Sequence, residues 1–162
     1  MTGIPAGWND FFVAEAGASA ALAGLVFVAV SINLARILEF AHLPMRVVEA
    51  LAALLSVLIV STFALVPEQP LWAYGVEMGG TGLGVLALKS TALIRMRRAG
   101  SPNPRPVLRF LVNEITPLPF VTAGVLLTAG SRSGIYWIVP GTLLSFAAGL
   151  FDVWVLLIEI KR

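Results

Sequence analysis

The sequence predicts an all-α fold, a polytopic transmembrane helical bundle with five membrane-spanning helices. Of the 162 residues, 58% are hydrophobic and only 12% are charged, and the mean hydropathy is +0.90. A soluble domain needs a polar coat, and about 25% of its residues are typically charged. In addition, five long apolar segments alternate with short polar or proline-rich stretches. Lipid is therefore the expected surroundings for most of the surface.

A single transmembrane domain over residues 1–162 is expected, because the connections between the apolar segments are too short for a second domain. A membrane helix needs about 20 mostly apolar residues. No Lys or Arg precedes Phe11, so the first apolar segment is interpreted as a retained span and not as a secretory signal. The five expected spans are 11–37, 45–66, 71–94, 107–129 and 134–160.

Turn-forming residues separate these spans. Pro44 stands where a helix can start, and residues 67–70 combine two prolines with two polar side chains. Residues 99–106 contain three prolines and cannot continue a helix, because proline lacks the amide donor. The fourth span is interrupted by two polar residues and two further prolines, Asn113, Glu114, Pro117 and Pro119. It is therefore either a kinked full span or a broken, partly re-entrant one.

Basic residues give the orientation. Positively charged residues near span ends collect on the cytoplasmic side of a membrane. With five spans, the first loop, the third loop and the C-terminal end share one side, and that side holds ten of the eleven Lys and Arg residues, leaving Arg132 on the other. The N-terminus is therefore expected outside and the C-terminus in the cytoplasm. The loop from Arg95 to Arg109 is also expected to contact anionic lipid.

Small residues recur at helical spacing in three of the spans. Helices in lipid associate mainly through close packing, which small side chains permit. These faces either pack the five helices of one chain together or bind a second copy or a partner membrane protein. The residues concerned are Ala16, Ala20 and Gly24 in the first span, Gly75 and Gly79 in the third, and Gly141, Ser145 and Gly149 in the fifth.

Ionisable residues inside the spans are the second candidate feature. Such groups are costly in lipid, usually face the bundle interior and often mark a pathway. Two acids, Glu15 and Glu77, belong to the outer half of the expected bundle. We hypothesise that the polar residues of the cytoplasmic half form one cluster, in which Lys89 is the counter-ion of Glu114 or Asp152. Its six members are Asn33, Glu49, Lys89, Asn113, Glu114 and Asp152.

Three interpretations of this cluster stay open. It is a hydrogen-bonded knot that holds helices together, an ion or proton site open to the cytoplasm, or a set of independent positions near water. Enzyme chemistry is not expected, because the one histidine, His42, lies in a loop and the chain has no cysteine. No metal-binding motif, no cofactor signature and no basic stripe for nucleic acid is present in the sequence.

Several stretches resemble a known family. Residues 8–12 (Trp-Asn-Asp-Phe-Phe), 24–34, 136–137 (Tyr-Trp), 144–146 and 154–160 carry the likeness. Together they resemble a family of small, mostly uncharacterised bacterial integral membrane proteins, some of which are automatically labelled modulator of FtsH protease. The resemblance implies a multi-pass protein of the bacterial inner membrane, and it carries no functional residue over to this chain.

Two classes of function follow from these observations. The first is a non-enzymatic accessory or regulatory membrane protein that acts through helix–helix contact with itself or with a membrane complex. The second is a small oligomeric channel or transporter for protons or small cations, which uses the acids of the cytoplasmic half. The first needs packing faces, and the second needs a continuous polar path across the membrane.

Overall fold

The computed structural model describes residues 3–40, 43–98 and 115–160. All regular structure within these ranges is helical, which confirms the all-α prediction for this part of the chain. The elements in chain order are η1 (Ala6–Trp8), α1 (Asn9–Ile32), α2 (Leu34–Glu39), α3 (Leu43–Ala64), α4 (Leu71–Arg98), α6 (Leu118–Thr128), η2 (Arg132–Trp137) and α7 (Ile138–Ile160).

Three segments are long and apolar enough to cross a membrane: Asn9–Ile32, Leu43–Ala64 and Arg132–Ile158. Length and composition therefore mark the chain as a helical membrane protein. The α4 helix has 28 residues, about 42 Å, but it also carries Glu77 and Lys89. The α6 helix has only 11 residues, so its length of about 16 Å covers half of a hydrocarbon core about 30 Å thick.

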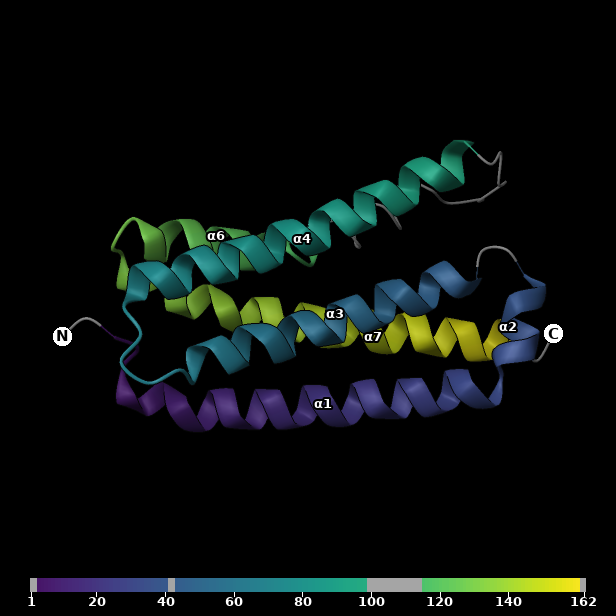
Figure 1. The fold of residues 1–162 in the computed structure, drawn as a ribbon, viewed down its shortest axis with the longest axis horizontal. Helices are drawn as coiled ribbons and strands as arrows, with labels where there is room; N and C mark the ends of the chain where they lie inside the picture. The colour runs from purple at the N-terminus through teal and green to yellow at the C-terminus, as the bar shows by residue number, and fades with distance from the viewer. Residues whose placement is uncertain (1–2, 41–42, 99–114, 161–162) are drawn as a thin grey trace.

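The long helices lie side by side and alternate in direction along the chain (Figure 1). The α3 helix is central, because it packs against α1, α4 and α7, while α6 packs mainly on α4. One end of the bundle, here called the aromatic end, holds Trp8, Trp72 and Trp137 near the starts of α1, α4 and α7. The opposite end, here called the basic end, holds α2, the start of α3 and the end of α4.

The first apolar segment is not one continuous helix as predicted. The α1 helix ends at Ile32, five residues before the expected end of the span, and α2 begins at Leu34. Asn33 lies between them with φ −108° and ψ 14°, and its side-chain Nδ2 donates to the carbonyl oxygen of Ala29 at 2.8 Å. This bond satisfies a carbonyl at the helix end, which lets the chain change direction there.

The start of the fourth segment shows the effect of its prolines. Ile115 is helical, Thr116 and Pro117 form a turn, and α6 begins at Leu118 with Pro119 in its first turn. Proline is tolerated at the start of a helix because no intrahelical amide donor is needed there. Residues 107–114 of the predicted span lie outside the described residues, so the choice between a kinked and a broken span stays a prediction.

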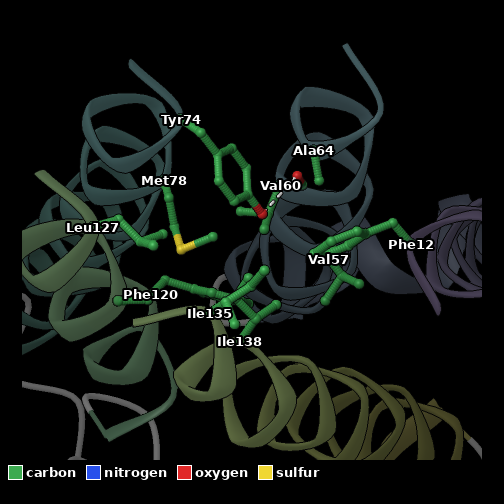
Figure 2. Packing of buried hydrophobic residues seen from close by; sticks show 11 residues of the cluster. Phe12, Val57, Val60, Ala64, Tyr74, Met78, Phe120, Leu127, Ile135 and Ile138 are labelled. Carbon is green, nitrogen blue, oxygen red and sulfur yellow. Dashed lines mark hydrogen bonds between the residues drawn. The ribbon is translucent and has the colours of Figure 1, made fainter. Parts of the chain in front are cut away.

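The main core lies toward the aromatic end and joins all the long helices (Figure 2). The Tyr74 ring enters it from α4, and the Tyr74 hydroxyl donates to the carbonyl oxygen of Val60 at 3.4 Å. Phe12 brings α1 into the same core, with its ring centroid 6.3 Å from that of Tyr74. A second, smaller cluster at the basic end consists of Ile37, Leu43, Val47 and Leu156.

The α4 and α6 helices are in backbone contact at glycines. A Cβ atom on Gly124 would lie 2.5 Å from Cα and 2.6 Å from N of Gly79. A Cβ atom on Gly75 would lie 2.6 Å from the backbone nitrogen of Thr128. Real side-chain atoms do not approach so closely, so only glycine at these positions lets the two helix axes come together.

We predict that Gly124→Ala destabilises the protein, because the added methyl group collides with the backbone of Gly79. Overpacking of this kind costs about 1–3 kcal/mol. Reversible unfolding in mixed micelles measures the change in the free energy of unfolding. Gly84→Ala is the matched control, since a Cβ there meets no atom within 4 Å and only the gain in helix propensity remains. Equal stability of the two variants would contradict the close contact.

Candidate functional site

Three charged side chains are buried on three different helices. Glu49 on α3 is 6% exposed, Lys89 on α4 is 2% exposed and Asp152 on α7 is 6% exposed. Each of them has a hydrogen-bonding or electrostatic partner. Removing a charge from water costs several kcal/mol unless it is compensated by partners. A buried charge on each of three packed helices is therefore the strongest candidate for a functional site.

Helix packing brings two of these charges to neighbouring turns. A Cβ atom on Gly149 would lie 3.1 Å from Cγ of Leu54 and 3.4 Å from the carbonyl oxygen of Ala50. Because α3 and α7 run in opposite directions, Asp152, one turn beyond Gly149, lies level with the turn of α3 that contains Glu49. The backbone positions of these two buried acids thus lie at a similar level of the antiparallel α3–α7 pair.

The other predicted members of the cluster are placed differently. Asn33 is half-buried and uses its amide to bond its own helix, at the carbonyl of Ala29. Asn113 and Glu114 lie outside the described residues. The structure thus buries Glu49, Lys89 and Asp152 on α3, α4 and α7, and it places Asn33 at the end of α1.

The two acids predicted for the outer half have contrasting surroundings. Glu77 is half-buried, and its Oε2 accepts a hydrogen bond from Nε2 of Gln69 at 2.5 Å. Glu15 is also half-buried, but its Oε2 is shielded from solvent and has no hydrogen-bond partner. A buried oxygen without a donor is uncommon in native proteins and calls for a specific explanation.

Buried hydroxyl groups continue the polar character of the interior. The Ser19 hydroxyl donates to the carbonyl oxygen of Leu54 and thereby ties α1 to α3. Ser61 on α3 and Ser145 on α7 are 0% and 1% exposed, and their Oγ atoms have no hydrogen-bond partner. Leaving a buried polar group unpaired costs about 1–3 kcal/mol of stability. Packing alone does not explain why hydroxyl groups occupy these two positions.

The predicted small-residue faces divide into covered and open ones. Gly141 packs on the ring of Phe120, with a Cβ position 2.6 Å from Cε1, and Gly149 packs on Leu54. Gly75 and Gly79 contact α6 as described above. On α1, by contrast, Ala16 is half-buried, Ala20 and Gly24 are exposed, and a Cβ on Gly24 would meet no atom within 4 Å.

Three residues important to this arrangement were not singled out by the sequence. Gly124 has only Thr128 as a small neighbour at four-residue spacing, so its role depends on α4 approaching from elsewhere in the chain. Ser19 and Ser61 are single hydroxyls in apolar helices, where most serines bond their own backbone. Only the three-dimensional packing distinguishes them from such serines.

Comparisons with known proteins leave the family open. No protein-family model matches the chain, and neither the curated proteins nor the solved structures include a significant match. Within the described ranges, no group of three or more His, Cys, Asp or Glu side chains is placed to hold a metal ion. The buried charges and the open face of α1 are therefore the features of the described residues that point to a function.

Proposed function

We propose that the protein is a non-enzymatic, multi-pass protein of the bacterial inner membrane that acts by helix–helix association with itself or with a membrane complex. An accessory or regulatory role suits this architecture. The proposal includes five spans, an external N-terminus and a cytoplasmic C-terminus. It agrees with the resemblance to small bacterial membrane proteins noted from residues 8–12 and 154–160.

The open face of α1 carries the proposal. Only 11% of the most apolar window of α1 is buried, against 50% for α3 and 39% for Arg132–Ile158. Between residues 14 and 24, every exposed residue of α1 is small. A Leu- or Phe-rich surface would suffice for contact with lipid, whereas small side chains allow another helix to approach closely. The exposed small residues are Ala14, Gly17, Ala18, Ala20, Ala21 and Gly24.

We expect Gly24→Ile to weaken self-association without harming the fold, since the new side chain points into open space. Overpacking at the contact costs about 1–3 kcal/mol, which corresponds to association that is weaker by roughly fivefold to 150-fold. Stepwise photobleaching of labelled protein at low density in lipid bilayers counts the copies per particle. Leu25→Ile, at an exposed neighbour, is the control that leaves the count unchanged. A wild-type count of one, with no co-purifying membrane protein, would refute the proposal.

The distribution of charge supports the orientation. Arg36, Arg46 and Lys89 all belong to the basic end of the bundle, whereas Arg132 belongs to the aromatic end. Alternating helix direction places the start of α1 and the end of α7 at opposite ends, as an odd number of spans requires. Both observations favour a cytoplasmic basic end.

This topology predicts the behaviour of reporter fusions. Green fluorescent protein fused after Arg162 should fluoresce, because it folds to its fluorescent form in the cytoplasm. Alkaline phosphatase fused at the same position should be inactive, because this enzyme becomes active only outside the cytoplasm. Alkaline phosphatase inserted after Arg132 should be active, which provides the internal control. An active phosphatase at the C-terminus would indicate four spans, with the segment 107–129 not crossing.

A second function, transfer of protons or small cations, is favoured by one observation. Buried polar groups occur at several levels of α3 and α7, from Glu49 and Asp152 through Ser145 to Ser61, and Glu15 adds an unpaired carboxylate oxygen on α1. A path for ions needs such groups in series. Two hydroxyl groups in this series, those of Ser61 and Ser145, have no hydrogen-bond partner. They can therefore form a hydrogen bond with a water molecule that carries a proton, or their oxygens can coordinate a small cation.

We predict, for this second function, proton flux into liposomes that contain the protein and carry a pH gradient and a membrane potential. Asp152→Asn should reduce the flux severalfold, because the substitution removes one of the buried ionisable groups toward the basic end. Glu39→Gln, an exposed acid at the same end, serves as the control and should leave the flux unchanged. A rate equal to that of empty liposomes would exclude this function.

A further inference from the structure

An apolar groove runs along α4 and α6 and is open at the surface of the protein. Its volume is about 450 Å³ and its lining is mainly apolar. The glycine contact between the two helices lies at its floor. Its walls are formed by Val76, Gly80 and Leu83 of α4 and by Val125, Thr128 and Ala129 of α6. A groove of this kind accepts a helix whose own surface is small at the point of contact.

We propose that the α1 helix of a second copy of this chain occupies the groove. The inference builds on the proposed self-association and specifies its interface. On α1 the exposed residues Gly17, Ala21 and Gly24 succeed one another at steps of four and three, so they form one narrow ridge. A glycine-rich ridge fits a glycine-floored groove, since both backbones can come close.

The two surfaces overlap in depth within the bundle. Both α1 and α4 begin at the aromatic end and run toward the basic end (Figure 1). Ala14 and Val76 are each five residues after the first residue of their helix, and Ala21 and Leu83 are each twelve residues after it. At 1.5 Å per residue, the ridge from Gly17 to Gly24 lies about 12–22 Å from the start of α1, and the groove from Gly75 to Leu83 lies about 6–18 Å from the start of α4, so the two overlap in depth.

Charge complementarity supports the same pairing. Asp10 is exposed one turn before Ala14, at the outer end of the ridge. Arg132 is exposed four residues after Thr128, at the outer end of the groove. When copies share one orientation in the membrane, Asp10 of one copy and Arg132 of the next come to the same level. Opposite charges across an interface fix its register and disfavour the alternatives.

The geometry of the contact determines the type of assembly. In Figure 1, α1 lies along one edge of the bundle and α4 with α6 along the other, and α3 and α7 lie between them. Ridge and groove are thus different surfaces of one copy. An interface between two different surfaces is head-to-tail, and it gives a ring where the rotation between copies closes and an open filament where it does not. Each copy would then use both surfaces.

Disulfide cross-linking in native membranes tests the interface, because the wild-type chain contains no cysteine. The double variant Ala21→Cys/Leu83→Cys carries one thiol on the ridge and one at the matching depth in the groove. After oxidation with copper phenanthroline it should give a ladder of dimers and larger species. Ala21→Cys alone and Leu83→Cys alone should stay uncross-linked. Ala21→Cys/Val76→Cys, whose thiols differ in depth by about 10 Å, should also stay uncross-linked.

The outcomes separate this inference from the proposed function. Dimers from Ala21→Cys alone would show α1 packed on α1, which overturns the groove assignment and leaves self-association intact. No cross-link from any variant, together with several photobleaching steps for the wild type, overturns the groove assignment alone. No cross-link from any variant, together with single photobleaching steps for the wild type, overturns both the groove assignment and the proposed self-association. Asp10→Arg should weaken the ladder of the double variant severalfold, and adding Arg132→Asp should restore it; a ladder unaffected by either change contradicts the charge pairing.

Discussion

The contact between Gly124 and Gly79 is the constraint on which much of the structure depends. Burial of apolar surface drives folding in water, but in lipid it gives little preference for helix–helix over helix–lipid contact. Close packing has to supply that preference. A Cβ on Gly124 would lie 2.5 Å from Cα of Gly79, so glycine alone permits this approach. The contact holds α6, too short to cross a bilayer by itself, against α4, and it also forms the floor of the open groove.

The other helices are joined by a different mixture of interactions. The α3 helix is central and combines an apolar core at the aromatic end with buried charges at the basic end. Ser19 bonds to the carbonyl of Leu54 across the α1–α3 interface, and Gly149 lets α7 approach the backbone of Ala50. Charges such as Glu49 and Asp152 remain buried only where several helices enclose them. The packing that excludes lipid from the interior therefore also keeps these acids buried.

The sequence predicted the helical membrane class and most helix boundaries, because both follow from hydropathy and proline placement. Leu71 begins α4 as expected, and Pro44 lies in the first turn of α3. The break at Asn33 was missed, since a hydropathy window does not register the bond from one amide to the carbonyl of Ala29. Gly124 was missed for a related reason: its importance depends on a helix more than forty residues away in the chain. Burial of Glu49, Lys89 and Asp152 is likewise a result of packing between helices, although their positions within apolar segments indicated them as candidates.

The α1 helix shows why packing within one chain does not account for all the small residues. Gly75, Gly124, Gly141 and Gly149 each have a neighbour that a larger side chain would strike. Gly17 and Gly24 have none within 4 Å, and glycine in a helix interior costs about 0.5–1 kcal/mol relative to alanine. Contact with lipid does not offset that cost, whereas close packing against a second helix does. The uncovered glycines of α1 are therefore better explained by a partner than by the fold of a single copy, and the groove on α4 and α6 offers an apolar surface that overlaps them in depth.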